Sequence, residues 1–241
     1  MARVTTIEWT ERTWNPVTGC SKVSQGCKHC YAERLADRFW GDRPFTEVRC
    51  HPERLSHPQS IRKGSMFFVN SMSDLFHPDV PDEFIHAVFN VMRECPRHTF
   101  QVLTKRSERL AQLGQQLPWP SNVWMGVSVE DGRVIERVEH LKAAPAAVRF
   151  LSLEPLIGPL DDLPLEGLHW VIVGGESGPG ARPMKASWVK SIRRQCRAAA
   201  VPFFFKQWGG VFKKRAGRLL DGRIYNELPE RVTPLRAALQ T

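Results

Sequence analysis

A cluster of cysteines near the amino terminus is the part of this sequence whose residue types and spacing best suit chemistry. Cys20, Cys27 and Cys30 fall within eleven positions, with six residues between the first two and two between the last two. Cys27 and Cys30 can bind one centre from a single turn, and Cys20 can close the loop around it. Three thiolates are one short of the four that a structural zinc ion or an ordinary iron–sulfur cluster takes. The pattern predicts a metal centre with one open position, or with a fourth ligand from elsewhere.

Three interpretations of the cysteine cluster follow from the residues. We favour an iron–sulfur cluster, because an open position on a cluster is what reactive chemistry uses. A structural zinc site needs a fourth ligand, for which the candidates are His29, Cys50 and His51. A redox dithiol needs Cys27 and Cys30 alone. The isolated cysteines are otherwise expected to be small buried apolar residues: Cys50, Cys95 and Cys196.

A repeated pattern of strands and helices must position these cysteines. Apolar runs typical of strands occur at 13–17, 66–71, 100–104, 123–128, 148–153, 170–173 and 203–205. Segments with helical spacing occur at 82–94, 107–113, 133–143 and 187–199. Continuous apolar runs indicate strands buried on both faces of a parallel sheet. The sequence predicts an α/β fold, a partial (β/α)6-type barrel of six or seven units, with a flat doubly wound sheet as the alternative.

Polar residues follow these strands at the edge where parallel α/β folds place their sites. Four of them are expected nearest the substrate: Asp74, Lys105, Glu154 and Lys206. Lys and Glu are not preferred helix caps, so capping does not explain three of the four. Three hydroxyl residues at the same ends are candidates for cofactor binding, with capping as the alternative: Ser71, Thr104 and Ser128.

A glycine-rich turn, 174–180, leaves the strand at 170–173. Gly174 and Gly175 permit a close backbone approach, and successive free N–H groups of such a turn can hold a carboxylate or phosphate. The turn matches neither a P-loop nor the full dinucleotide fingerprint. Plain turn geometry is the alternative.

The charge is uneven along the 241 residues. Residues 181–241 hold 14 of the 34 Lys and Arg but only three acids, whereas residues 1–180 have a net charge of −2. This block predicts a polyanionic partner, nucleic acid first, with a solvated tail as the alternative. Residues expected to form a phosphate-contacting rim are Lys190, Arg193, Arg194, Arg197, Lys213, Lys214, Arg215, Arg218 and Arg223, with Trp208 stacking on a base. We divide the chain into a barrel domain, 1–211, and a basic C-terminal extension, 212–241.

No apolar run approaches the roughly 20 residues that span a bilayer, and the first ten residues hold no apolar stretch typical of a signal peptide. We therefore expect a cytoplasmic protein with no membrane partner.

The segment Cys27-Lys28-His29-Cys30-Tyr31-Ala32, on the loop after the first strand of a partial barrel, resembles the radical S-adenosylmethionine superfamily. The resemblance implies a [4Fe–4S] cluster on the three cysteines, with S-adenosylmethionine chelating the open iron and its cleavage starting hydrogen abstraction. It also implies that the residues beside the third cysteine, His29 and Tyr31, and the turn with Glu176 contact the cofactor, Glu176 accepting from a hydroxyl. The spacing departs from the superfamily's commonest pattern, which has three residues between the first two cysteines.

A second resemblance covers nearly the whole chain. Phrases such as 14–20 (WNPVTGC), 70–76 (NSMSDLF), 151–156 (LSLEPL) and 206–209 (KQWG) resemble the three-cysteine-motif phage protein family, which carries a domain of unknown function. The layout is similar to the spore photoproduct lyase branch of the radical enzymes, which acts on DNA.

The sequence as a whole predicts an iron–sulfur, radical S-adenosylmethionine-like enzyme that acts on a nucleotide or nucleic acid. The alternative is a non-catalytic nucleic-acid-binding protein with a structural zinc site. The reaction is not encoded in any motif, and the sequence leaves open whether a separate partner protein takes part.

Overall fold

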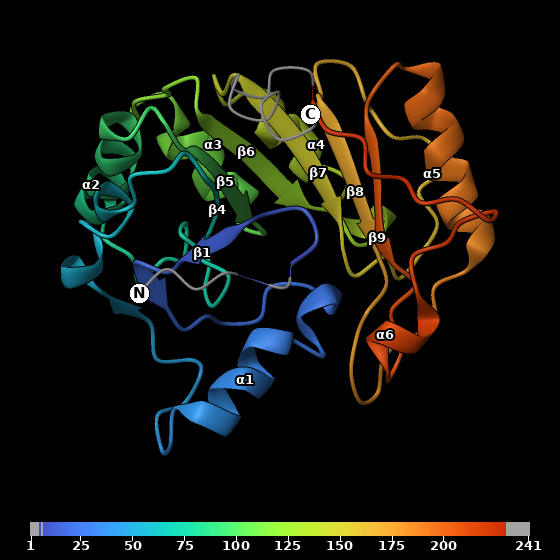
Figure 1. The fold of residues 1–241 in the computed structure, drawn as a ribbon, viewed down its shortest axis with the longest axis horizontal. Coiled ribbons are helices and arrows are strands. Elements are labelled where there is room, and N and C mark those ends of the chain that lie inside the picture. The colour runs from blue at the N-terminus through green and yellow to red at the C-terminus, as the bar shows by residue number, and fades with distance from the viewer. Residues whose placement is uncertain (1–4, 6, 230–241) are drawn as a thin grey trace.

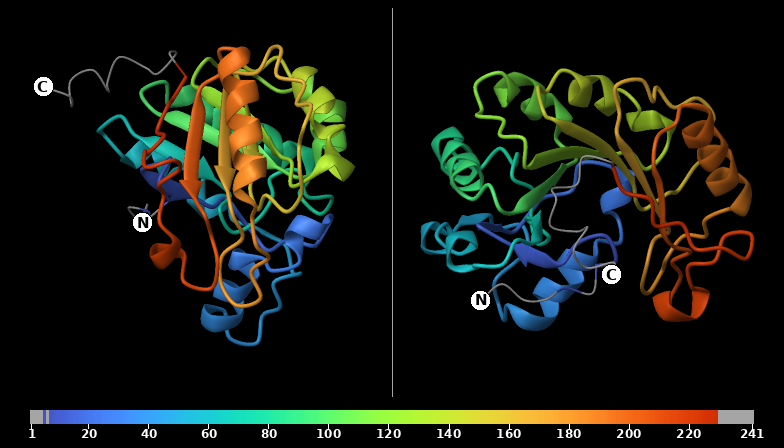
Figure 2. Two further views of the ribbon diagram at one scale, coloured as in Figure 1. Left: turned by 90° about the vertical axis from the view of Figure 1, so that its right-hand side faces the viewer. Right: turned by 45° about the horizontal axis from the view of Figure 1, so that its top comes forward.

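Seven parallel strands form one curled sheet in the computed structural model, which describes residues 5 and 7–229 (Figure 1). The strands are β1 (Arg12–Trp14), β4 (Met66–Val69), β5 (Thr99–Thr104), β6 (Val123–Ser128), β7 (Val148–Leu153), β8 (Trp170–Gly174) and β9 (Phe203–Gln207). Their order in the sheet is β1-β4-β5-β6-β7-β8-β9, and every neighbouring pair is parallel. The sheet curls into a half-barrel, as Figure 2 shows, which confirms the predicted partial barrel.

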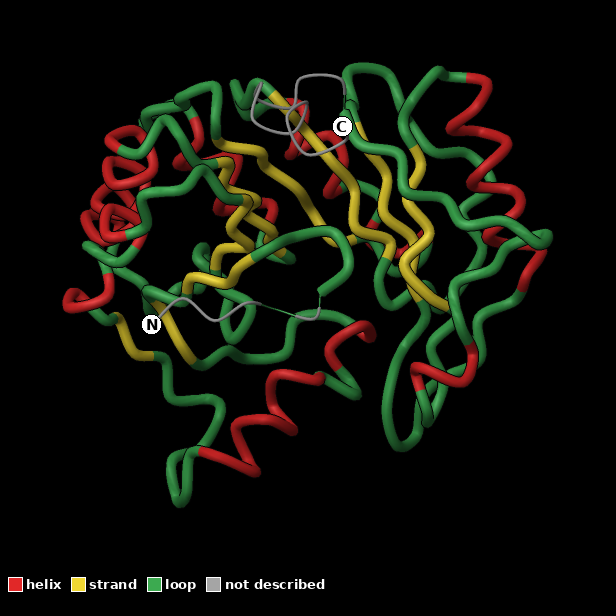
Figure 3. Tube along the Cα trace, in the orientation of Figure 1, coloured by secondary structure: helices red, strands yellow, loops and turns green. Residues whose placement is uncertain are grey.

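The helices lie outside the curl. They are α1 (Tyr31–Phe39), α2 (Asp82–Glu94), α3 (Ser107–Gly114), α4 (Arg137–Lys142), α5 (Ala186–Ala198) and α6 (Lys213–Ala216). Short 3-10 turns are η1 (Gln25–Cys27), η2 (Pro52–Arg54), η3 (Pro58–Ser60) and η4 (Gly132–Val134), and β2 (Val17–Thr18) pairs antiparallel with β3 (Arg49–Cys50). Helix α4 packs on β6 and β7, and α5 packs on β9, so they cover the convex face (Figures 1 and 3).

Two predicted elements are divided in the structure. The first strand, predicted at 13–17, ends at Trp14, because Pro16 has no N–H to donate to a neighbouring strand. The helix predicted at 133–143 begins as the 3-10 turn η4, and α4 starts only at Arg137. The Asp131 carboxylate accepts the backbone N–H of Arg133 at 3.0 Å, which fixes this first turn.

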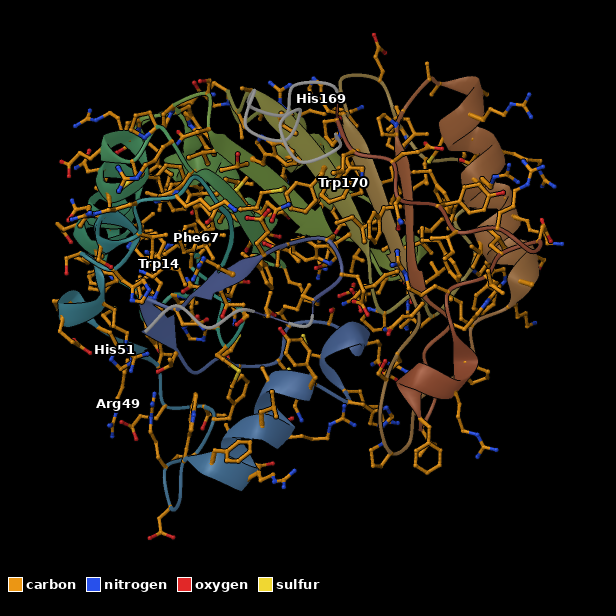
Figure 4. All side chains as sticks on the ribbon, viewed as in Figure 1. Trp14, Arg49, His51, Phe67, His169 and Trp170 are labelled. Atoms are coloured by element: carbon orange, nitrogen blue, oxygen red, sulfur yellow. The ribbon has the colours of Figure 1, made fainter. Side chains whose placement is uncertain are left out.

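An aromatic floor fills the amino-terminal half of the concave face. Its members are Trp9, Met66, Phe68, Trp124, Val148, Phe150, Trp170, Ile172 and Phe204, and Trp170 is labelled in Figure 4. Gly126 leaves the space that Phe150 occupies, since a Cβ there would lie 2.5 Å from the phenyl ring. Because side chains alternate along a strand, the residues above this floor face the same concavity. The space for a ligand is therefore at the carboxyl ends of the strands.

Residues 217–229 return to the sheet after α6. Asn226 forms an antiparallel bridge with Phe204, and the Trp170 indole N–H donates to the carbonyl of Glu227 at 2.8 Å. Residues 230–241 of the predicted basic extension lie outside the described residues. In the described part of the chain, no helix is both long and apolar enough to cross a membrane.

Candidate functional site

Three of the four residues predicted nearest the substrate lie at the top of the concave face. They are Lys105, Glu154 and Lys206. In each case the residue two positions earlier packs with the aromatic floor or faces the concave side, and side chains two positions apart along a strand share a face. Lys206 Nζ lies 2.6 and 2.8 Å from the two carboxylate oxygens of Glu154, and Lys105 Nζ lies 3.4 Å from Glu130 Oε1. The structure thus brings these charges together as two ion pairs above the floor.

Asp74, the fourth, holds the structure of the site together. Its Oδ1 accepts from Thr104 Oγ1 at 2.7 Å and the Phe76 amide at 3.0 Å. Its Oδ2 accepts from the Lys105 amide at 3.0 Å and Arg106 Nη1 at 3.1 Å. Both carboxylate oxygens of Asp74 are therefore engaged by groups of the protein itself. Thr104 is predicted to bind cofactor, and its hydroxyl donates its hydrogen bond to Asp74.

Arg106 connects Asp74 to the cysteine loop. Its Nη1 donates to Cys20 Sγ at 3.4 Å, and its Nη2 donates to the carbonyl and the hydroxyl of Ser21, both at 3.0 Å. Burial, and then the charge of Asp74, raises the pKa of Cys20 to about 11, although Arg106 acts in the opposite direction. Thiolate formation at Cys20 therefore needs a further positive charge, which a metal would supply.

The loop between Cys20 and Cys27 packs on the end of β6. Ser24 Oγ donates to Glu130 Oε1 at 2.9 Å, and a Cβ on Gly26 would lie 2.4 Å from the Glu130 carboxylate. Glu130 Oε2 also accepts from the buried Arg137 at 3.0 Å. A pocket of about 440 Å³ lies between the cysteine loop and the segment that follows β6. Its lining residues are Lys22, Val23, Ser24, Gln25, Glu130, Asp131, Arg133 and Val134.

His29 and Glu176, both predicted to bind cofactor, contact each other. His29 Nδ1 lies 2.9 Å from Glu176 Oε2, while Arg182 bonds both carboxylate oxygens and donates its own amide to Oε2 at 2.9 Å. Burial alone would raise the pKa of Glu176, but the hydrogen bonds from Arg182 and His29 outweigh it and lower the pKa to about 2. Glu176 is a fixed anion that joins the β8 turn to the cysteine loop.

The glycine-rich turn interlocks β8 and β9. A Cβ on Gly175 would lie 2.0 Å from the Trp208 carbonyl oxygen, and the Gly175 amide donates to the Gln207 carbonyl at 3.0 Å. A Cβ on Gly174 would lie 3.1 Å from Glu154. Because Gly175 and Gly178 both use their amides within the protein, turn geometry explains these glycines without a bound anion.

The other candidates for cofactor binding lie near the cysteines or above the floor. The Tyr31 hydroxyl donates to the Ser71 carbonyl at 2.6 Å, and Ser71 Oγ donates to the Asn15 side chain at 3.2 Å. Ser128 is 1% exposed and its Oγ has no hydrogen-bond partner. Two further buried polar atoms at strand ends also have none, Asn70 Nδ2 and Gln207 Oε1.

The cysteine loop offers three thiols as donors for a metal centre. Cys20, Cys27 and Cys30 are free and half-buried, and Cys27 is near enough to influence the pKa of Cys20. Within residues 5 and 7–229, no three His, Cys, Asp or Glu side chains converge on one metal ion. A tetrahedral zinc ion takes four such side chains, and a [4Fe–4S] cluster takes one cysteine on each iron that the protein ligates.

The proposed fourth zinc ligands are engaged elsewhere. His51 bonds Thr18 Oγ1 at 2.8 Å and Glu53 at 3.0 Å, and it lies with Arg49 in the segment between α1 and β4 (Figure 4). Cys50 is half-buried in β3 against the core, and His29 faces Glu176. Cys95 and Cys196 are buried apolar residues, as predicted.

Sequence reasoning missed three arginines of the site. Arg106 holds Cys20, Arg137 holds Glu130, and Arg182 holds Glu176. Arg106 directly follows Lys105 at the end of the strand predicted at 100–104, which was a usable signal, but nothing in the sequence links Arg137 or Arg182 to a particular acid.

A half-barrel of parallel strands with a cysteine loop at the carboxyl edge defines the class of this protein. The chain belongs to the family described as "Protein of unknown function (DUF5131)", whose model matches residues 4–229. No curated protein matches the sequence.

Solved structures of spore photoproduct lyase are similar in fold. A mutant with bound AdoMet and dinucleoside spore photoproduct has a TM-score of 0.52 at 12% identity, covering 81% of this chain and 63% of that one. A complex with dinucleoside spore photoproduct has a TM-score of 0.51 at 13% identity, with the same coverage. This chain therefore spans less than two thirds of those proteins. At such identity the likeness shows the fold alone.

Proposed function

We propose that this protein is an iron–sulfur enzyme that uses S-adenosylmethionine and acts on a nucleotide or nucleic acid. Cys20, Cys27 and Cys30 would hold a [4Fe–4S] cluster with one open iron. The observation that carries the proposal is the position of these free thiols at the carboxyl edge of a half-barrel, the same edge at which three buried polar atoms have no hydrogen-bond partner. When bound, the cluster and cofactor would supply an electron and start hydrogen-atom abstraction.

The residues of this chain would prepare the site. Arg106, anchored by Asp74, holds Cys20, and Glu130 holds the loop through Ser24. The aromatic floor excludes water from below the site. Ser128 Oγ, Asn70 Nδ2 and Gln207 Oε1 remain available to hydrogen-bond a polar ligand, since each would otherwise be buried at a cost.

The Glu154–Lys206 pair would orient the ligand at the top of the concave face. Lys206 gives the site a cation and Glu154 holds it in place, with 12% and 22% of their side chains exposed. His29 and Glu176 would brace the cysteine loop against the β8 turn, in place of a direct contact with the cofactor.

A nucleic-acid substrate is supported by two features. The last quarter of the chain carries the excess positive charge, and two solved structures of similar fold are complexes with dinucleoside spore photoproduct. A cytoplasmic location and a domain boundary at residue 211 stay predictions.

Anaerobic purification followed by iron and sulfide analysis tests the proposal. The protein is expected to be brown, with about four irons and sulfides per chain, and after reduction to convert S-adenosylmethionine to 5′-deoxyadenosine. The Cys27→Ala variant should lose the iron and this activity, while Cys95→Ala, at a buried cysteine outside the site, should keep the iron. A colourless protein with one zinc would support the non-catalytic alternative and overturn the proposal.

A further inference from the structure

Exposed large apolar side chains of the described residues occur in only two segments. The first is the cysteine loop with α1, which exposes Val23, Tyr31, Leu35 and Phe39. The second is the stretch after β9, which exposes Val211, Phe212, Leu219 and Ile224. Tyr31, Leu35 and Phe39 recur at every fourth residue and so share one face of α1. Clustered exposure of this kind marks a binding surface.

The β8 turn joins the two segments into one surface at the carboxyl edge. Arg34 in α1 donates to the Ser177 carbonyl at 2.5 Å. Gly210 donates to the Glu176 carbonyl at 2.8 Å and accepts from the Gly178 amide at 3.1 Å. Phe212 therefore lies two residues from the edge of the site, within about 7 Å along the chain. We call the surface of α1, residues 176–178 and residues 208–224 the rim face. Helices α1 and α6 both lie below the lower edge of the sheet in Figure 1.

The charge of residues 208–224, the carboxyl-terminal part of the rim face, favours a polyanion. Residues 208–224 contain five Lys and Arg against Asp221 alone, and Asp221 is paired with Lys190 at 2.6 Å. Arg215 and Arg223 are exposed. The Arg215 amide donates to the Phe212 carbonyl at 2.9 Å, so an exposed guanidinium lies one turn from an exposed phenyl ring.

Trp208 is predicted to stack on a base, but its ring is engaged within the protein. Its indole N–H donates to the Leu219 carbonyl at 2.8 Å, and its ring packs on Phe205 at 4.9 Å. Part of the predicted basic rim is also engaged, because Arg193 lies over Tyr225 and Arg218 bonds the Phe205 carbonyl. Phe212, at 65% exposed, has its ring free for a ligand. The side chains of Lys213 and Lys214 lie outside the described part.

We infer that the rim face binds single-stranded nucleic acid, with a base stacked on Phe212 and a phosphate held by Arg215. The inference rests on the proposed function and names the residues that would hold its substrate. A phenyl ring accepts any base, and the arginine contacts the backbone, so binding tolerates sequence and depends on salt. The aromatic floor closes the barrel below, so a strand reaches the site along this rim.

Fluorescence anisotropy of a short labelled single strand of mixed sequence, with the anaerobically purified full chain, tests the inference. Phe212→Ala and Phe212→Leu are each expected to weaken binding about 5- to 150-fold, whereas Phe212→Trp keeps it. Arg215→Gln should lower the slope of log affinity against log salt by about one. Leucine is the decisive control, because it retains apolar area without a π face.

Wild-type affinity in Phe212→Leu would overturn the inference, because binding of the strand would then not depend on an aromatic ring at position 212. Equal or tighter binding of the same sequence as a duplex would also overturn it. Iron and sulfide are measured in the same samples. Protein without iron contradicts only the proposed function, while iron-loaded protein whose affinity is unchanged by Phe212→Ala contradicts only this inference.

Discussion

The Asp74 carboxylate gives the sharpest stability prediction. It is 5% exposed and accepts four hydrogen bonds, two on each oxygen, from Thr104, Phe76, Lys105 and Arg106. In Asp74→Asn an amide NH₂ replaces one oxygen. Arg106 loses its carboxylate partner whichever way the neutral amide turns, and the amide NH₂ then faces at least one N–H donor, either the Phe76 amide or the Lys105 amide and Arg106 Nη1.

Removing one partner of a buried ion pair costs about 3–5 kcal/mol, because the other charge stays buried and unpaired. Arg106 keeps its bonds to Cys20 and Ser21, so the lower end applies, and we expect Asp74→Asn to lose about 3 kcal/mol of unfolding free energy. Urea denaturation measures this as a lower midpoint at an unchanged slope.

Glu139→Gln is the matched control. Glu139 forms an exposed pair with Lys142 at 3.0 Å, and such pairs contribute under about 1 kcal/mol. A loss below about 1 kcal/mol in Asp74→Asn would refute the argument that the Asp74 network is dry and fully paired. Iron content of the same variant should fall, since Arg106 positions Cys20.

Three further predictions follow from single contacts. Gly175→Ala places a Cβ against the Trp208 carbonyl oxygen and should cost about 1–3 kcal/mol in urea denaturation, whereas Gly132→Ala, which meets nothing within 4 Å, should be nearly neutral. Glu176 has a pKa near 2, below its ordinary 4.5, so the ionised carboxylate stabilises the fold above about pH 4.5, and this stabilisation is lost as the pH falls toward 2. The melting temperature of Glu176→Gln should therefore decline less than that of the wild type between pH 4.5 and pH 2. An equal decline in the two proteins would contradict the pairing of Glu176 with Arg182. If the proposed function holds, Glu154→Gln should keep its iron but form 5′-deoxyadenosine at least about tenfold more slowly, because Lys206 loses the carboxylate that holds it. Such a change corresponds to about 1.4 kcal/mol of activation free energy. An unchanged rate would show that the Glu154–Lys206 pair is not part of the site.

The strands could be predicted because each is a continuous apolar run bounded by polar residues. Segments 123–128 and 148–153 begin and end where the sequence indicates. Alternation along a strand then places Lys105, Glu154 and Lys206 on the concave face. The ends of elements next to Pro16 and Asp131 were less predictable, because proline geometry and a capping carboxylate act locally against the apolar pattern.

The sequence could not predict in the same way which charged side chains of the site contact each other. His29 and Glu176 are 147 residues apart, and Asp74 and Arg106 are 32 apart, so their contacts depend on how the sheet curls. A sequence shows which charges reach the strand ends but not which charges neutralise each other there. For this reason the arginines that pair with Asp74 and Glu176 could not be foreseen, and the expected roles of these two acids toward ligands stay predictions.

The six residues between Cys20 and Cys27 have a structural explanation. The loop extends far enough for Ser24 and Gly26 to contact Glu130 at the end of β6, while Arg106 at the end of β5 holds its beginning and His29 joins its end to the β8 turn. Three strand ends thus fix one loop, and each contact uses a charged group that is buried or half-buried. A shorter spacing would leave Glu130 with Arg137 and Lys105 alone and would remove one wall of the pocket beside β6. The unusual spacing therefore positions the cysteines against the sheet, and this is compatible with the same thiol chemistry as a shorter loop.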